Sequence, residues 1–130
     1  MLITRPAQVS AEAFEERGAR GVLRRTLVSE AQGSKFFRLR FYSLQPGGQT
    51  PYDVHVYEHL VIVTSGEGSV LTRLKGVPTV RSIREGDVVY IGPGEPHQFI
   101  NTGTRPLEFY CFGTSPSLYR EEGLAETGLA

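Results

Sequence analysis

The frequency of turn residues is the feature that most constrains how this 130-residue chain can fold. Fifteen glycines and eight prolines divide much of the chain into short segments, many of which alternate polar and apolar side chains. Alternation with a period of two is typical of β-strands, and strands separated by short turns pair as hairpins. The sequence therefore predicts an all-β fold of eight or more short strands, arranged as an antiparallel sandwich or barrel.

The expected strands lie between turn signals such as PGGQTP, GEG and TGTRP. They cover residues 21–30, 34–44, 52–65, 69–75, 79–85 and 107–113, and residues 86–101 read as a strand, a turn and a second strand. Residues 10–20 begin with Ser10 as a helix cap and stop at Gly18, which predicts a short helix or an N-terminal arm. The tail, residues 114–130, is polar and predicts partial disorder or a short terminal helix. Without a linker or an internal repeat, residues 1–130 are expected to form a single domain.

Composition excludes several classes of function. Fourteen basic residues balance fourteen acidic ones, so no overall field draws the chain to nucleic acid or to an anionic membrane. The arginines are scattered, which indicates a solvated surface. One cysteine, Cys111, excludes an internal disulfide framework and a thiolate zinc cluster. The lack of a signal peptide and of an 18-residue apolar segment predicts a cytoplasmic protein.

Residues 34–44 show the clearest alternation. Phe37, Leu39 and Phe41 lie on one side of the expected strand, and Arg38 and Arg40 lie on the other. We expect Phe37 and Phe41, together with Tyr57 and Phe99, to line the mouth of the barrel or to fill its core.

All three histidines fall in two of these segments, PYDVHVYEHLVIV and GPGEPHQFIN. In a straight strand Asp53, His55, Tyr57 and His59 share one face, and apolar residues continue that face into the core. The histidines are therefore expected to line a pocket. Taken one at a time, a buried histidine is more often a core residue with a satisfied hydrogen bond than a ligand, and Asp53 could be a turn cap.

The two histidine segments resemble the two sequence motifs of the cupins. Residues 47–66 contain the glycine, the His-x-His-like pair, a further ligand position and the turn glycine of the first motif. Residues 86–101 resemble the second motif, in which Gly86, Pro93, Gly94, His97 and Asn101 fill the family positions while Gly92 replaces the usual leading proline. The resemblance implies a double-stranded β-helix, or jelly-roll, barrel with a metal inside.

Within the cupins, DVHVYEH is similar to a subgroup with the sequence His-x-His-Pro-Trp-Glu-His, with Asp53 in place of the first histidine. The resemblance implies that the metal ligands are Asp53, His55, His59 and His97. Three imidazoles and one carboxylate suit one divalent transition metal such as Fe, Mn, Zn, Ni, Co or Cu, and they leave coordination positions open.

The resemblance further implies a small metal-binding cupin that acts on a small oxygenated organic molecule. Dioxygenase-type chemistry is the first hypothesis, because the histidines serve as ligands and little is left for proton transfer. The alternatives are a metal-dependent isomerase, lyase or cyclase, and a non-catalytic binding module. Cys111 is expected to be a small core residue. An outward-facing apolar set that includes Leu60, Ile62, Phe36 and Tyr42 predicts a homodimer.

Overall fold

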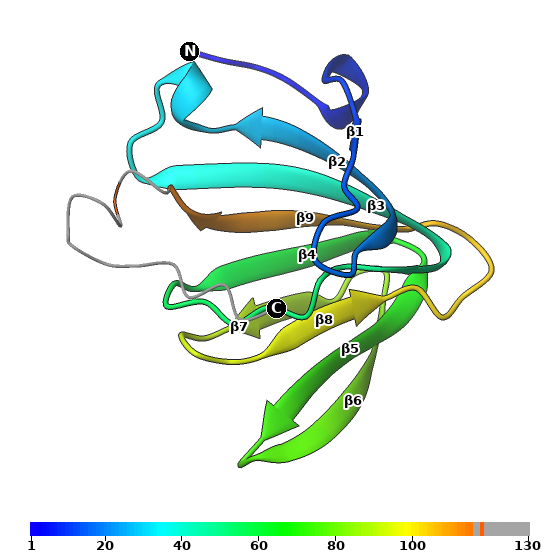
Figure 1. The fold of residues 1–130 in the computed structure, drawn as a ribbon. Coiled ribbons are helices and arrows are strands. Elements are labelled where there is room, and N and C mark those ends of the chain that lie inside the picture. Colours follow the sequence, from blue (N-terminus) through cyan, green and yellow to red (C-terminus); the bar gives the residue numbers. More distant parts are fainter. Residues whose placement is uncertain (116–117, 119–130) are drawn as a thin grey trace.

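The computed structural model describes residues 1–115 and 118, and in this part of the chain almost all regular structure is β-strand (Figure 1). The strands are β1 (Glu12–Ala13), β2 (Arg20–Val28), β3 (Phe37–Gln49), β4 (His59–Ser65), β5 (Glu67–Leu74), β6 (Val77–Arg84), β7 (Val88–Ile91), β8 (His97–Ile100) and β9 (Leu107–Thr114). Two short 3-10 helices, η1 (Pro6–Gln8) and η2 (Glu30–Gln32), flank β1 and β2. The predicted all-β fold is confirmed.

The strands form one curled antiparallel sheet. Its order is β6-β5-β8-β3-β9-β4-β7, and β2 joins it along the other edge of β3. The long strand β3 pairs with β2 and β9 along most of its length and with β8 at its end, so it connects two walls of a barrel. Figure 1 shows β2, β3, β9 and β4 side by side, with β5 and β6 extending away as a hairpin. This is the jelly-roll barrel that the sequence predicts.

The interior of the barrel receives alternate side chains of β4. His59, Val61 and Val63 are buried, whereas Leu60 and Ile62 are 40% and 46% exposed on the outer side. The buried apolar residues form one cluster: Phe14, Ala19, Val22, Leu44, Val61, Val63, Val70, Ile83, Ile91, Phe99, Leu107 and Phe109. At the end of β4 the chain turns at Gly66, where a Cβ atom would lie 2.3 Å from the carbonyl oxygen of Pro106. The turn glycine of the first motif is therefore required by the close approach of another segment.

Residues 10–20 were expected to form either a short helix or an N-terminal arm. The structure shows the arm. Glu12 and Ala13 pair with β2 instead. Phe14 is buried in the core, and the Arg24 guanidinium lies 4.3 Å from the centroid of its ring. Burying an aromatic ring contributes about 2 kcal/mol, which exceeds the preference of a few residues for a helix.

The side chains of β3 point in the direction opposite to the prediction. Arg38 and Arg40 face the interior and line a cavity there, so the interpretation of these arginines as solvated surface is wrong. Phe37, expected to line the mouth of the barrel or to fill its core, is 54% exposed, whereas Phe41 is buried against Tyr110. The pairing with β9 explains this result: Arg40 lies opposite Cys111, which packs against the core, and cross-strand partners share a face.

Tyr42 follows the arginines on the same face of β3. Its ring stacks on Phe109 inside the barrel, with ring centroids 5.3 Å apart. Tyr42 therefore does not belong to the outward-facing apolar set, whereas Leu60, Ile62 and Phe36 do lie exposed.

Two predicted segments differ from regular strands. Residues 52–58, expected to be part of one long strand with β4 or a second strand joined to it by a bend, are an irregular connection. This connection contacts β8 through a bridge between Asp53 and His97, and the preceding Thr50 forms hydrogen bonds with Gln98 and Phe99. Apart from Thr114, Ser115 and Leu118, the predicted tail lies outside the described residues. Among the residues that the structure describes, no helix is long and apolar enough to span a membrane.

Candidate metal centre

Three elements bring the predicted ligands together. His59 is the first residue of β4, His97 is the first residue of β8, and Asp53 and His55 lie on the connection that precedes β4. The backbones of Asp53 and His97 bond to each other in both directions, with N–O distances of 3.0 and 2.9 Å. All four side chains are buried.

The three imidazoles form a compact group. One ligand atom from each of His55, His59 and His97 lies within 4.8 Å of the others. The ring centroids are 5.1 to 5.6 Å apart. Nitrogen atoms bound to one ion at 2.0–2.1 Å are roughly 3 to 4 Å apart, so small side-chain rotations close the group around a metal. The described structure thus brings three of the expected ligands together in a group that could hold a metal ion.

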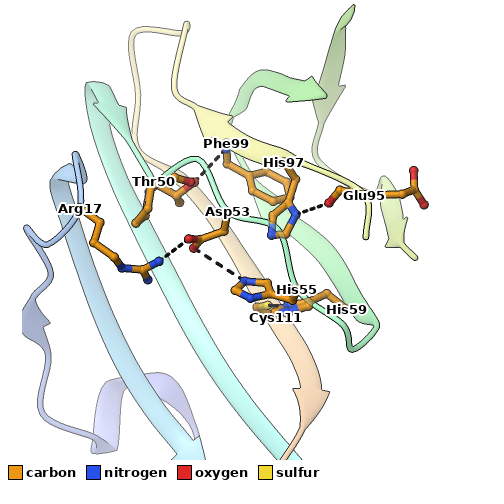
Figure 2. Close-up of polar contacts among 10 residues, drawn as sticks. Arg17, Thr50, Asp53, His55, His59, Glu95, His97, Phe99 and Cys111 are labelled. Carbon is orange, nitrogen blue, oxygen red and sulfur yellow. Dashed lines mark hydrogen bonds and ion pairs between the residues drawn. The ribbon is translucent and has the colours of Figure 1, made fainter. Parts of the chain in front are cut away.

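His97 is held in the tautomer that a metal ligand needs. Its Nδ1 lies 3.0 Å from the carbonyl oxygen of Glu95, which only accepts hydrogen bonds (Figure 2). The neutral ring therefore donates through Nδ1, and Nε2 keeps its lone pair. Burial lowers the pKa of His97, which keeps the ring neutral at physiological pH.

His59 is also neutral and has a free ring nitrogen. Its Nδ1 lies 3.1 Å from the Cys111 sulfur, while its buried Nε2 has no hydrogen-bond partner in the described structure. Burial, with contributions from the other two histidines, lowers the pKa of His59 to about 3. A buried polar atom without a partner is costly, and a metal ion would satisfy Nε2 in the tautomer that carries its proton on Nδ1.

Cys111 supports His59 rather than serving as a nucleophile. Burial raises the pKa of its thiol to about 11, so the sulfur stays protonated at neutral pH. Cys111 packs against the core as predicted, and its contact with His59 Nδ1 is a role that the sequence did not indicate.

Asp53 lies beside the histidines but is bound to an arginine. Its Oδ1 forms an ion pair with Arg17, and its Oδ2 is 3.7 Å from His55 Nε2 (Figure 2). Asp53 does not belong to the group of mutually close ligand atoms, which contains only the histidines. Its role as a fourth ligand stays a prediction. Arg17 comes from the N-terminal arm, and nothing in the sequence connects it with Asp53.

A cavity of about 250 Å³ opens next to these residues. Part of the cavity wall is apolar and consists of Tyr57, Val61, Ile91 and Phe99. Four arginines also line the cavity, namely Arg17, Arg24, Arg38 and Arg40, together with the carboxylates of Glu16 and Asp53. A buried, partly apolar cavity with a few converging polar groups is the usual form of a small-molecule site.

Two polar residues of the second motif have structural roles. The Asn101 amide donates to the carbonyl oxygens of Leu44 and Arg105 at 2.8 Å, and its oxygen accepts from the Gly103 amide. Gln98 donates to the carbonyl oxygen of Thr50 at 2.8 Å. Both residues hold the β8 region in place, and neither lines the cavity.

Comparison with known proteins agrees with this architecture. The sequence model described as "Cupin domain" matches residues 40–113, which include β4 to β8, most of β3 and β9, and all three histidines. No curated protein sequence matches the chain.

Solved structures share the fold over 71% to 93% of the chain. The polyketide cyclase RemF from Streptomyces resistomycificus is 24% identical over 93% of both chains, with a TM-score of 0.80, a likeness of fold. A predicted oxalate decarboxylase from Thermotoga maritima is 27% identical and has a TM-score of 0.75; the match covers 88% of this chain and 99% of that one. A cupin 2 domain-containing protein from Halorhodospira halophila is 34% identical with a TM-score of 0.64, over 71% of this chain and 62% of that one.

Proposed function

The chain belongs to the cupin domain family, and from this premise we propose that it is a metal-dependent enzyme acting on a small oxygenated organic molecule. The observation that carries the proposal is the group of three buried, mutually close imidazoles, of which His59 has a buried Nε2 without a partner. Histidines that serve only as core residues would have both polar ring atoms satisfied.

His55, His59 and His97 are the proposed ligands, and Asp53 is the proposed fourth. When bound, a divalent transition ion supplies Lewis acidity and, for a redox-active ion such as iron, the electron transfer that oxygen chemistry requires. The protein orients the ligands through Cys111 at His59 and the Glu95 carbonyl at His97. Such outer partners fix the ring orientation and tautomer.

Dioxygenase-type chemistry is favoured by the scarcity of groups that could transfer protons. All three histidines are proposed ligands, and Asp53 is engaged by Arg17. Four other cavity residues carry a titratable carboxyl, phenol or thiol group. Glu16 is exposed, and Tyr57 stacks on the His55 ring with centroids 4.6 Å apart. Tyr42 stacks on Phe109, and burial keeps the Cys111 thiol protonated. A reaction that demands a strong general base is therefore poorly served by this cavity.

The second candidate is a metal-dependent isomerase, lyase or cyclase. The arginines on the cavity wall favour it, because guanidinium groups stabilise negative charge that develops on a substrate. The similar structures of a polyketide cyclase and a predicted oxalate decarboxylase are compatible with this alternative.

Metal analysis and oxygen dependence test the proposal. Purified protein is expected to bind one divalent ion per chain, and His59→Ala and His97→Ala should each abolish that binding. Thr64→Ala is the matched control, because Thr64 lies on β4 but is exposed outside the cavity. Wild-type protein that takes up no Fe, Mn or Zn at micromolar concentration would contradict the proposal.

Turnover of a panel of hydroxy acids, oxo acids and diketones with and without O2 then separates the two chemistries. A requirement for O2 indicates the dioxygenase, and equal anaerobic turnover indicates the isomerase, lyase or cyclase. Binding of metal and ligand without any turnover would indicate a binding module.

A further inference from the structure

The wall that faces the histidines is built from three neighbouring strands in fixed register. Gly113 on β9 lies opposite Arg38 on β3 and opposite His59 on β4. In the next inward-facing row, Cys111 lies between Arg40 and Val61. Because cross-strand partners face the same side, the row that contains Gly113 sets Arg38 and His59 on one surface with no side chain between them.

Gly113 carries no side chain, so nothing in this row separates Arg38 from His59. A Cβ atom there would lie 3.9 Å from both Cε1 and Nδ1 of His59. The Cα atoms of Arg38 and His59 are two strand spacings apart, about 10 Å. An arginine side chain spans much of that distance, so a small molecule on this wall can touch a guanidinium group and approach the imidazoles together.

Arg38 and Arg40 lack the carboxylate partners that the other cavity arginines have. Arg17 pairs with Asp53, and Arg24 pairs with Glu12 at 2.7 Å. Neither Arg38 nor Arg40 forms an ion pair with any carboxylate of residues 1–115 and 118.

Arg40 is the more deeply placed of the two. Its Nε is buried without a hydrogen-bond partner in the described structure. Burial lowers the pKa of Arg40, the neighbouring Arg38 and Arg24 add to this effect, and the Tyr42 hydroxyl opposes it. The guanidinium group stays charged at neutral pH. Buried cations are costly unless paired, and an anion in the cavity would pair with them.

We propose that Arg38 and Arg40 form a carboxylate-binding subsite. The substrate is then a small organic carboxylate that carries a second oxygen-bearing group, such as a hydroxyl, which reaches the three histidines. Only the contact between this second group and the histidines rests on the proposed function. The contact with the carboxylate depends on the arginines alone. Bidentate hydrogen bonds from guanidinium to carboxylate are short and strong, which suits recognition in a site of this size. The cavity of about 250 Å³ restricts the substrate to a small molecule.

Calorimetric titration with 3-hydroxybenzoate and its neutral analogue 3-hydroxybenzamide tests the subsite. Wild-type protein is expected to bind the carboxylate at least about tenfold more tightly than the amide, since a charge-assisted bond is replaced by a neutral one. Arg38→Gln and Arg40→Gln should each reduce this preference severalfold or more. Arg73→Gln, an exposed position outside this cavity, should keep it.

Each protein is titrated both metal-free and loaded with zinc, and its zinc content and melting temperature are measured. The arginine variants should bind zinc as wild type does, and Arg40→Lys should recover part of the preference if Arg40→Gln folds poorly. Failure of wild type to bind zinc would contradict the metal centre, while an arginine-dependent preference in the metal-free protein would still support the subsite. Equal binding of acid and amide by wild type, or a preference that survives both glutamine substitutions, would overturn the inference.

Discussion

Replacing Arg17 with alanine is expected to tighten metal binding about fivefold. The Arg17 guanidinium holds the carboxylate of Asp53, the proposed fourth ligand, and a metal must compete with it for that carboxylate. The side chains of Arg17 and Asp53 are 41% and 12% exposed, so the pair is partly screened by water. A pair of this kind is worth about 1 kcal/mol, which corresponds to a factor of about five in the dissociation constant.

A four-protein cycle separates this mechanism from simple charge repulsion between Arg17 and the ion. Zinc affinity is measured by competition with a chromogenic chelator for wild type, Arg17→Ala, Asp53→Asn and the double variant. If Arg17 acts through the carboxylate, its removal tightens binding in wild type and has no effect beside Asp53→Asn. Asp53→Asn alone should weaken binding by at least about tenfold, because an anionic ligand is replaced by a neutral one.

Two results would refute this reasoning. Unchanged zinc affinity in Asp53→Asn would show that the carboxylate is not a ligand and that the Arg17 pair is structural. An equal gain from Arg17→Ala in both backgrounds would show that Arg17 acts on the ion by its charge alone.

Three further predictions concern pH, thiol chemistry and assembly. Metal-free protein should lose stability as pH falls from 6.5 toward 3, by up to about 1.4 kcal/mol per pH unit for His59. Burial lowers the pKa of this ring to about 3, so only the unfolded chain takes up the proton between these pH values. A free energy of unfolding in urea that is independent of pH in this range would contradict the prediction. Cys111→Ala should weaken zinc binding about tenfold, because the contact with His59 is lost. In the wild type, Cys111 should resist alkylation by iodoacetamide at neutral pH, and rapid labelling would argue against a buried thiol. The wild type should sediment as a dimer that Leu60→Glu or Ile62→Glu dissociates, since both side chains are apolar and about half exposed; a wild-type mass of one chain at micromolar concentration would exclude the dimer.

Local sequence signals were sufficient for the strands and for the histidines. Gly66 is fixed by the close approach of the Pro106 backbone and by its positive φ, and it marks the end of β4. The spacing of Asp53, His55 and His59 brought these side chains to one cavity even though residues 50–58 are not a regular strand. Alternation still holds from residue 51 to residue 58, where the odd-numbered residues are buried and the even-numbered ones are not.

Contacts between segments that are distant in the sequence could not be predicted from local sequence patterns. Arg17 reaches Asp53 from an arm whose sequence favours a helix, and the burial of Phe14 decides the conformation of that arm. The contact between Cys111 and His59 depends on the pairing of β9 with β4, which no local pattern specifies.

The orientation of β3 had the largest consequence for function. An alternation of phenylalanine and arginine fits a strand in two ways, and the hydrophobic effect alone favours phenylalanine inside. In this barrel the inner face of β3 borders a polar cavity, and the observed register sets Arg38 and Arg40 there and Phe37 outside. The same choice therefore supplies cationic groups to the proposed substrate site and adds an apolar side chain to the outer surface. A shift of β3 by one residue against β9 would reverse both effects together, so the carboxylate subsite and the proposed dimer surface depend on one register.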